Sequence, residues 1–193
     1  MALINASEIF RGIDRELWLI TAQTSTRRGG LIATFVSQAS LPTDLPRVSV
    51  GVAKQHHTWS LIEESHAFGL HLLSEEQIEW VWRFGLQSGR DVDKLEGLPF
   101  RNGLSGCPLL AGVPAWLECR VETQLDTGDR TVYLAEVIDA GREGVLRPLT
   151  TQAMLRVASD DQRRELLAQM QHDSAVDAEA IRGWRQARVQ GGA

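Results

Sequence analysis

Two neighbouring stretches of the chain decide the fold: Gly30–Leu41 (GLIATFVSQASL) and Arg47–Lys54 (RVSVGVAK). In the second stretch valines occupy every other position from Val48 to Val52, which is typical of a strand with one buried face. The first stretch predicts another extended segment. Residues 41–46, which separate the two, include two prolines and therefore predict a loop.

Further strands are predicted on both sides of this pair. Leu17–Thr24 is rich in β-branched and aromatic residues, and Phe68–Leu73 has a similar character. Trp116–Leu125 alternates apolar and polar residues, and Arg130–Ala140 returns after the turn Asp126–Asp129. This last pair predicts a β-hairpin.

Helices are predicted at fewer places. His57–Ser65 is one, and the capping-box pattern Ser74–Gln77 begins another that ends near Gly85. Near the C-terminus, Ser159-x-x-Gln162 begins a helix, and a second helical stretch carries Ile181 and Trp184. Strands and helices do not alternate, so the order favours a mainly β, mostly antiparallel barrel or sandwich over a doubly wound parallel sheet.

The composition is that of an ordinary globular protein. Of 193 residues, 43% are hydrophobic and 23% are charged, and the net charge is −5. A broad basic footprint for nucleic acid is therefore not expected. The N-terminal stretch Met1–Asn5 lacks the features of a signal peptide, and no apolar run is long enough to span a membrane. Cys107 and Cys119 match no disulfide framework, so we expect a cytoplasmic protein with reduced thiols.

Several common catalytic motifs are absent. The sequence contains neither of the standard glycine-rich phosphate fingerprints and no histidine–cysteine spacing typical of zinc, so no metal site is predicted. Gly103–Cys107 (GLSGC) resembles a nucleophile elbow but lacks its final glycine and the strand-to-helix context. No catalytic acid, base or nucleophile is assigned from these patterns.

The segment Lys54–Ser60 has a pattern that suits an anion. A lysine follows a strand and precedes hydroxyl residues at the start of a predicted helix, where backbone amides and the helix dipole favour a phosphate. Lys54 is also one of only two lysines, the other being Lys94. The competing interpretation is structural: Thr58 caps the helix and Lys54 is a solvated charge.

Blocks along two thirds of the chain resemble one known family. Beside Gly30–Leu41 and the following Val50–Lys54, four more blocks occur in the family's order: Asp93–Gly97 (D-K-F-x-G in the family), Gly106–Leu110 (G-x-P-x-L), Ala115–Val121 (A-[WY]-L-E-C-x-V) and Gly128–Arg130 (G-D-H). The chain thereby resembles the flavin reductase-like, FMN-binding split-barrel family. It is most similar to the branch that forms the C-terminal reductase domain of flavodiiron proteins.

The resemblance implies a six-stranded antiparallel, Greek-key-like split barrel with flanking helices, a homodimer with non-covalent FMN (or FAD) near its interface. It implies an NAD(P)H-dependent FMN reductase that transfers a hydride from NAD(P)H, as co-substrate, to flavin for a partner oxygenase or another electron acceptor. The residues that it places at the cofactor are Thr34, Phe35, Val36, Ser37, Gln38, Lys54, Thr58, Ser60, Lys94 and Arg130.

The chain departs from the family at two places. Arg130 replaces the histidine of G-D-H, and arginine does not change charge near neutral pH. Residues 148–156 lack the tyrosines that usually follow the last strand. The helical tail lies outside the resemblance, so we predict a barrel domain at residues 1–157 and a helical extension at 158–193.

Two other functions are compatible with the same fold. One is a non-catalytic electron carrier that holds FMN, or a binding protein for another ligand such as haem; the arginine at position 130 and the tail keep this alternative open. The other is a barrel whose flavin site has decayed, for which Ile32 and Phe35 argue because many relatives have hydroxyl residues there.

Overall fold

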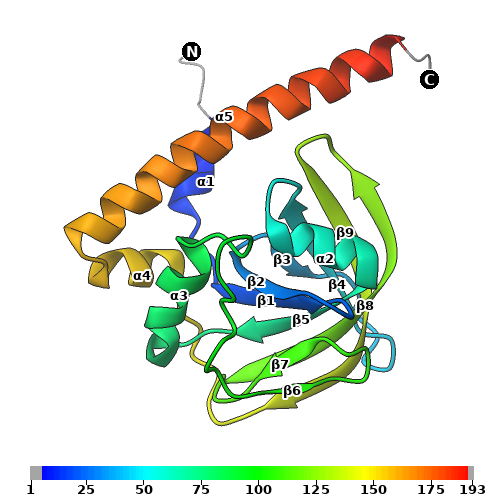
Figure 1. Cartoon of the computed structure of the whole chain (residues 1–193), viewed down its shortest axis with the longest axis vertical. Helices are drawn as coiled ribbons and strands as arrows, with labels where there is room; N and C mark the ends of the chain where they lie inside the picture. Colours follow the sequence, from blue (N-terminus) through cyan, green and yellow to red (C-terminus); the bar gives the residue numbers. More distant parts are fainter. Residues whose placement is uncertain (1–5, 191–193) are drawn as a thin grey trace.

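The computed structural model describes residues 6–190, so the N-terminal stretch Met1–Asn5 lies outside the described part. Its main sheet is antiparallel and curled, with helices around it (Figure 1). The sheet contains β1 (Trp18–Gln23), β2 (Arg28–Ala33), β3 (Val36–Gln38), β4 (Arg47–Ala53), β5 (Ala67–Leu72), β8 (Ala115–Asp126) and β9 (Arg130–Arg142). A separate pair is formed by β6 (Phe100–Asn102) and β7 (Pro108–Leu110). The helices are α1 (Ala6–Gly12), α2 (His57–Ser65), the 3₁₀ turn η1 (Glu75–Gln77), α3 (Ile78–Gly85), α4 (Thr151–Val157) and α5 (Asp160–Gln190).

The stretch Gly30–Leu41, which contains the end of β2 and all of β3, closes the barrel. The strand order is β2-β1-β5-β8-β9-β4-β3, so β2 and β3 lie at the two edges of the sheet. Yet β2 and β3 are consecutive, separated only by Thr34 and Phe35. One extended segment therefore bridges both edges, and counting it once gives the six strands of the predicted split barrel. The prediction of a mainly β, antiparallel barrel is confirmed.

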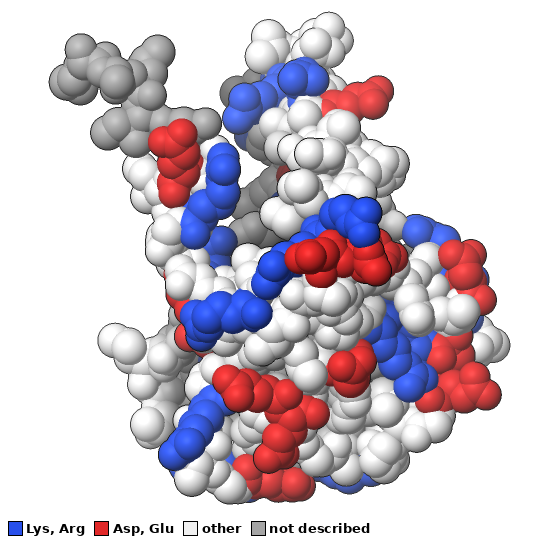
Figure 2. All heavy atoms as spheres, turned by 90° about the vertical axis from the view of Figure 1, so that its left-hand side faces the viewer, with Lys and Arg blue, Asp and Glu red and all other residues white. Residues whose placement is uncertain are grey.

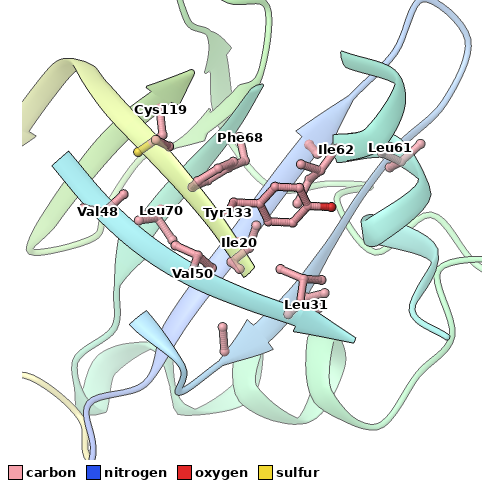
Figure 3. Close-up of a cluster of buried hydrophobic side chains, with 14 residues drawn as sticks. Ile20, Leu31, Val48, Val50, Leu61, Ile62, Phe68, Leu70, Cys119 and Tyr133 are labelled. Atoms are coloured by element: carbon pink, nitrogen blue, oxygen red, sulfur yellow. The ribbon is translucent and has the colours of Figure 1, made fainter. Parts of the chain in front are cut away.

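The barrel interior is filled by the apolar faces of its strands. The valines of β4 at positions 48, 50 and 52 are buried, as their alternation predicts. Figure 3 shows Tyr133 of β9 among Phe68, Ile20 and Ile62, from three other elements. The Tyr133 hydroxyl donates a 2.5 Å hydrogen bond to Glu63 of α2, so this polar group is paired although its ring is in the core.

A second apolar cluster joins α3 and α4 to the outside of the barrel. The predicted capping box is present: the Ser74 amide donates to the Gln77 side chain at 3.0 Å. It positions α3 so that Val81 and Phe84 are buried. This cluster fixes the loop that follows α3.

The C-terminal tail is one helix, so the prediction of two helical stretches is wrong. The Ser159 cap is confirmed, because the Gln162 amide donates to Ser159 Oγ at 3.2 Å. From there α5 continues for 31 residues. Residues 171–180 contain neither glycine nor proline, so nothing in the backbone interrupts it. No residue of α5 is buried.

The surface carries both signs of charge. Figure 2 shows lysines and arginines interspersed with aspartates and glutamates over the face that it presents. Within residues 6–190, no helix combines the length and the apolarity needed to cross a bilayer.

Candidate functional site

The edge strand β3 offers open backbone groups. The Phe35 carbonyl accepts from the Gly51 amide at 2.9 Å, and the Ala39 amide donates to the Arg47 carbonyl at 2.8 Å. Because hydrogen-bonding direction alternates along a strand, the amides of Val36 and Gln38 face away from β4, toward the open edge of the sheet. An acceptor-rich group can therefore bind along this edge.

Phe35 lies beside two arginines. Its side chain is 51% exposed, and the Arg130 guanidinium lies 4.9 Å from the ring centroid. Arg15 lies 5.6 Å from the same centroid. A Cβ at Gly51 would lie 3.4 Å from Phe35 Cβ, so the small residue leaves room for this ring. The structure thus brings together two predicted residues, Phe35 and Arg130, and adds Arg15, which the sequence patterns did not indicate.

The first turn of α2 has no side-chain cap. Its N-cap residue is His56, which forms no capping hydrogen bond, so the interpretation of Thr58 as the cap is wrong. Thr58 is buried, and Ser60 Oγ donates to the His57 carbonyl at 2.8 Å. The first amides of a helix lack intrahelical acceptors, so this turn can accept an anion from outside.

Lys94 lies on the neighbouring loop as a buried cation. It is 5% exposed, and its ammonium donates to the carbonyls of Phe84 and Gln87 at 2.9 and 3.1 Å. Burial lowers the pKa of Lys94 to about 8. Of the residues that the structure describes, no carboxylate forms an ion pair with it. A buried ammonium satisfied only by carbonyls is suited to an anionic ligand.

His56 and His57, at the start of α2, lie near several cationic side chains. Burial lowers the pKa of His57, and Arg27, Arg90 and Lys94 lower it further. Burial also lowers the pKa of His56, with contributions from the same lysine and from two arginines.

A hollow of about 560 Å³ opens beside this cluster. Its lining includes His57, the turn at residues 23–28 and the loop at residues 89–93. Arg90 reaches from that loop to the Gln55 carbonyl at 2.8 Å. Arg28 in the turn is paired with Asp93 at 2.6 Å. The hollow therefore has room for a phosphate-bearing group, and its lining carries Arg27, Arg28 and Arg90 together with Asp91 and Asp93.

Three predicted residues lie farther from this cluster. The Lys54 ammonium pairs with Asp126 in the β8–β9 hairpin at 2.7 Å. Ser37 and Gln38 are exposed on β3, where the Gln38 side chain donates to the Ser40 carbonyl at 2.6 Å. The elbow-like loop is structural, since Ser105 Oγ donates to Glu118 at 2.6 Å.

Helix α5 brings acidic residues to the same place. Asp177 accepts from Arg130 Nη2 at 2.6 Å, while Asp129 accepts from Arg130 Nε at 2.5 Å. Asp173 accepts from the Gln55 side chain at 2.8 Å. Burial raises the pKa of Asp177, against the effect of Arg130. No local pattern could have indicated these contacts, because Arg130 and Asp177 are 47 positions apart.

These features fit one kind of ligand. Open strand amides and an aromatic ring suit a planar, acceptor-rich heterocycle. The uncapped helix start, the buried lysine and the neighbouring arginines suit a phosphate attached to it. The donor set offers hydrogen bonds and charge but no arrangement of nucleophile and base, so the ligand itself would have to supply the reactive group.

The sequence is similar to a known domain family and to characterised reductases. The flavin reductase like domain matches residues 10–153. The chain is 30% identical over 135 residues to the ferric-chelate reductase (NAD(P)H) of Archaeoglobus fulgidus, covering 69% of this chain and 79% of that protein. It is 34% identical over 113 residues to the reductase subunit HsaB of a flavin-dependent monooxygenase from Rhodococcus jostii, covering 58% of this chain and 56% of that protein.

The fold is also similar to solved structures. The NADH:FAD oxidoreductase SgcE6 of Streptomyces globisporus superposes with a TM-score of 0.68 at 25% identity, covering 76% of this chain and 87% of that one. The matched residues 10–153 include β1 to β9, and so contain the β3 edge, the start of α2, Lys94 and Arg130. The chain belongs to the flavin reductase-like domain family.

Proposed function

We propose that this chain binds FMN at the site described above and is an NAD(P)H-dependent flavin reductase. The observation that carries the proposal is the meeting of two features at one place. One is the open, amide-bearing edge of β3, and the other is the group of cations around the uncapped start of α2. When bound, FMN supplies the acceptor for a hydride from the nicotinamide.

Each part of the site has a separate task in this proposal. The amides of Val36 and Gln38 donate to the polar edge of the ring, and Phe35 lies beside the ring. The first turn of α2 and Lys94 hold the phosphate. Arg130 beside Phe35 holds a second anionic group, because its guanidinium presents several hydrogen-bond donors. The protein binds and orients, and no side chain has to move a proton.

The first experiment is an absorbance spectrum of the purified protein before and after addition of FMN and dialysis. Flavin bands that survive dialysis support the cofactor assignment. Oxidation of NADH and of NADPH is then followed separately with excess free FMN. Turnover supports the reductase, whereas a bound flavin that neither nucleotide reduces supports the electron-carrier alternative. Absence of any flavin binding overturns the proposal.

We further infer a homodimer and a separate electron acceptor. The loop after β3 exposes Leu41 at 89% and Leu45 at 62%. Large apolar side chains exposed together on one loop are typical of a surface that a partner covers. The similarity to HsaB, a reductase subunit of a monooxygenase, supports delivery of reduced flavin to a partner oxygenase.

A further inference from the structure

Helix α5 lies against the residues that the proposed function assigns to the cofactor. The contacts of its middle part include Asp177 on Arg130 at 2.6 Å, Asp173 on Gln55 at 2.8 Å, and Trp184 against the hairpin turn. The last contact is close, because a Cβ at Gly128 would lie 2.6 Å from Trp184 Cβ. Figure 1 shows α5 extending away from the barrel beyond this region.

The acidic side chains of α5 take the place that an anionic ligand needs. Arg130 is the cation beside Phe35, and its guanidinium already binds the carboxylates of Asp129 and Asp177. Asp173 is the negative charge that acts on His56, in the midst of three cationic side chains. A phosphate or another anion therefore competes with these carboxylates for the same donors.

The attachment of α5 is shallow and incompletely satisfied. None of its residues is fully buried, and its apolar contacts are limited to half-buried side chains such as Leu166 and Trp184. Asp177 Oδ1 is buried and has no hydrogen-bond partner among the described residues. Leaving this oxygen unpaired costs free energy as long as α5 lies against the barrel. A helix held by a few polar contacts and half-buried side chains can open at a lower cost in free energy than one that carries part of the core.

We propose that α5 is an internal competitor of the cofactor, which FMN displaces when it binds. This inference rests on the proposed function. In the closed state the α5 carboxylates occupy the donors, and only the open fraction of molecules binds FMN. The apparent Kd is then the intrinsic Kd divided by that fraction, so weakening the closed contact tightens apparent binding.

The test uses the full-length chain and three variants. Asp177→Ala removes the contact with Arg130, and Trp184→Ala loosens α5 without changing charge. Glu179→Ala is the matched control, because Glu179 is an exposed acidic residue of the same helix. FMN affinity is measured by fluorescence quenching. Hydrogen exchange of α5 is measured with and without FMN, as a readout independent of activity.

We expect Asp177→Ala and Trp184→Ala each to lower the apparent Kd for FMN by about three- to tenfold, on the population argument. The control should change it less than about twofold, since distant surface charges are screened. In the wild type, FMN should speed hydrogen exchange in α5. If Asp177→Ala and Trp184→Ala bind FMN measurably and the wild type does not, that result also supports displacement of α5.

Other outcomes overturn the inference and keep it separate from the proposed function. Weaker binding in Trp184→Ala means that α5 forms part of the binding wall. Tighter binding in Asp177→Ala alone, with unchanged exchange, means simple charge repulsion. Equal affinities throughout leave the flavin site standing and remove the competitor. Absence of FMN binding in every variant overturns both proposals.

Discussion

Single residues near the site have roles that follow from their partners. Arg130, which departs from the G-D-H pattern that the resemblance implies, binds two carboxylates while lying over Phe35. A histidine would lose its charge above neutral pH and could not grip both acids at once. The two lysines also differ in their partners. Lys94 is buried and donates to backbone carbonyls, whereas Lys54 forms an ion pair with Asp126 at the surface.

Replacing Lys94 by methionine tests the proposed phosphate contact. Lys94→Met keeps the length of the side chain and removes its charge. Loss of one charge-assisted hydrogen bond predicts a rise in the Kd for FMN of about 10- to 100-fold. The measurement is a fluorescence-quenching titration, with Arg142→Met as the control at the far end of β9. Unchanged affinity in a variant that melts like the wild type would remove Lys94 from the site.

A buried histidine makes the fold sensitive to acid. His71 is fully buried: its Nδ1 pairs with the Leu19 carbonyl at 3.0 Å, and its Nε2 accepts from the Leu110 amide at 2.9 Å. Burial lowers the pKa of His71 from 6.5 to about 4. As pH falls, the unfolded chain therefore binds a proton at His71 before the folded protein does. The stabilisation is complete above pH 6.5 and is lost between pH 6.5 and about 4.

Protonation of His71 should lower the free energy of unfolding by roughly 3 kcal/mol as pH falls through this range. Urea unfolding at a series of pH values measures it. His71→Leu should be less stable at neutral pH, because it leaves two backbone groups unpaired, and should show a flatter pH dependence. An unchanged slope in that variant would assign the acid sensitivity to other groups.

Specific polar contacts orient the helices that apolar packing holds to the barrel. Trp59 Nε1 of α2 donates to Thr131 Oγ1 of β9 at 2.9 Å, which fixes the helix whose first turn enters the site. The capping box before α3 does the same for the loop that carries Lys94. Gln77 also donates to the Gly112 carbonyl at 2.8 Å, so it joins two loops.

Gln77→Ala should therefore cost more stability than Ser74→Ala. The serine change removes the hydroxyl contact with Gln77 and should cost about 1 kcal/mol. The glutamine change also leaves the Gly112 carbonyl without its donor, for a total of about 2 kcal/mol. Thermal and urea unfolding of both variants measures the difference. Equal losses would mean that the contact with Gly112 contributes nothing.

Among the described residues of the whole molecule, several large apolar side chains are exposed. Leu41 and Leu45 are exposed on the loop that follows β3, and α1 exposes Phe10 at 57%. Covering such groups in a second copy would stabilise a homodimer in proportion to the apolar area buried. The tail adds little to the core of its own chain, since α5 has no buried residue.

The double change Leu41→Asp with Leu45→Asp should shift the protein from dimer to monomer. Two charges placed in an apolar contact are costly, whereas at exposed positions of one chain they cost little. Light scattering after size exclusion gives the molar mass. Leu104→Asp is the control, because Leu104 is 75% exposed on a different loop. A monomeric wild type would refute the dimer.

Much of the fold could be read from local patterns. Alternating valines predict β4, the hairpin turn predicts β8 and β9, and Ser74 and Ser159 predict helix starts, all of which the structure contains. These signals are local because a strand or a cap depends on residues only a few positions apart. The continuity of the tail helix was missed, because apolar spacing alone does not show whether two helical segments are joined.

By itself, then, the sequence determined the strands, the caps and the family blocks, and through these the split barrel. Tertiary structure alone decided how β2 and β3 close it, which lysine is buried, and that Asp177 reaches Arg130 across 47 positions. The physical reason is range: periodicity and capping act within a few residues. Burial and ion pairing depend instead on which distant segments pack together.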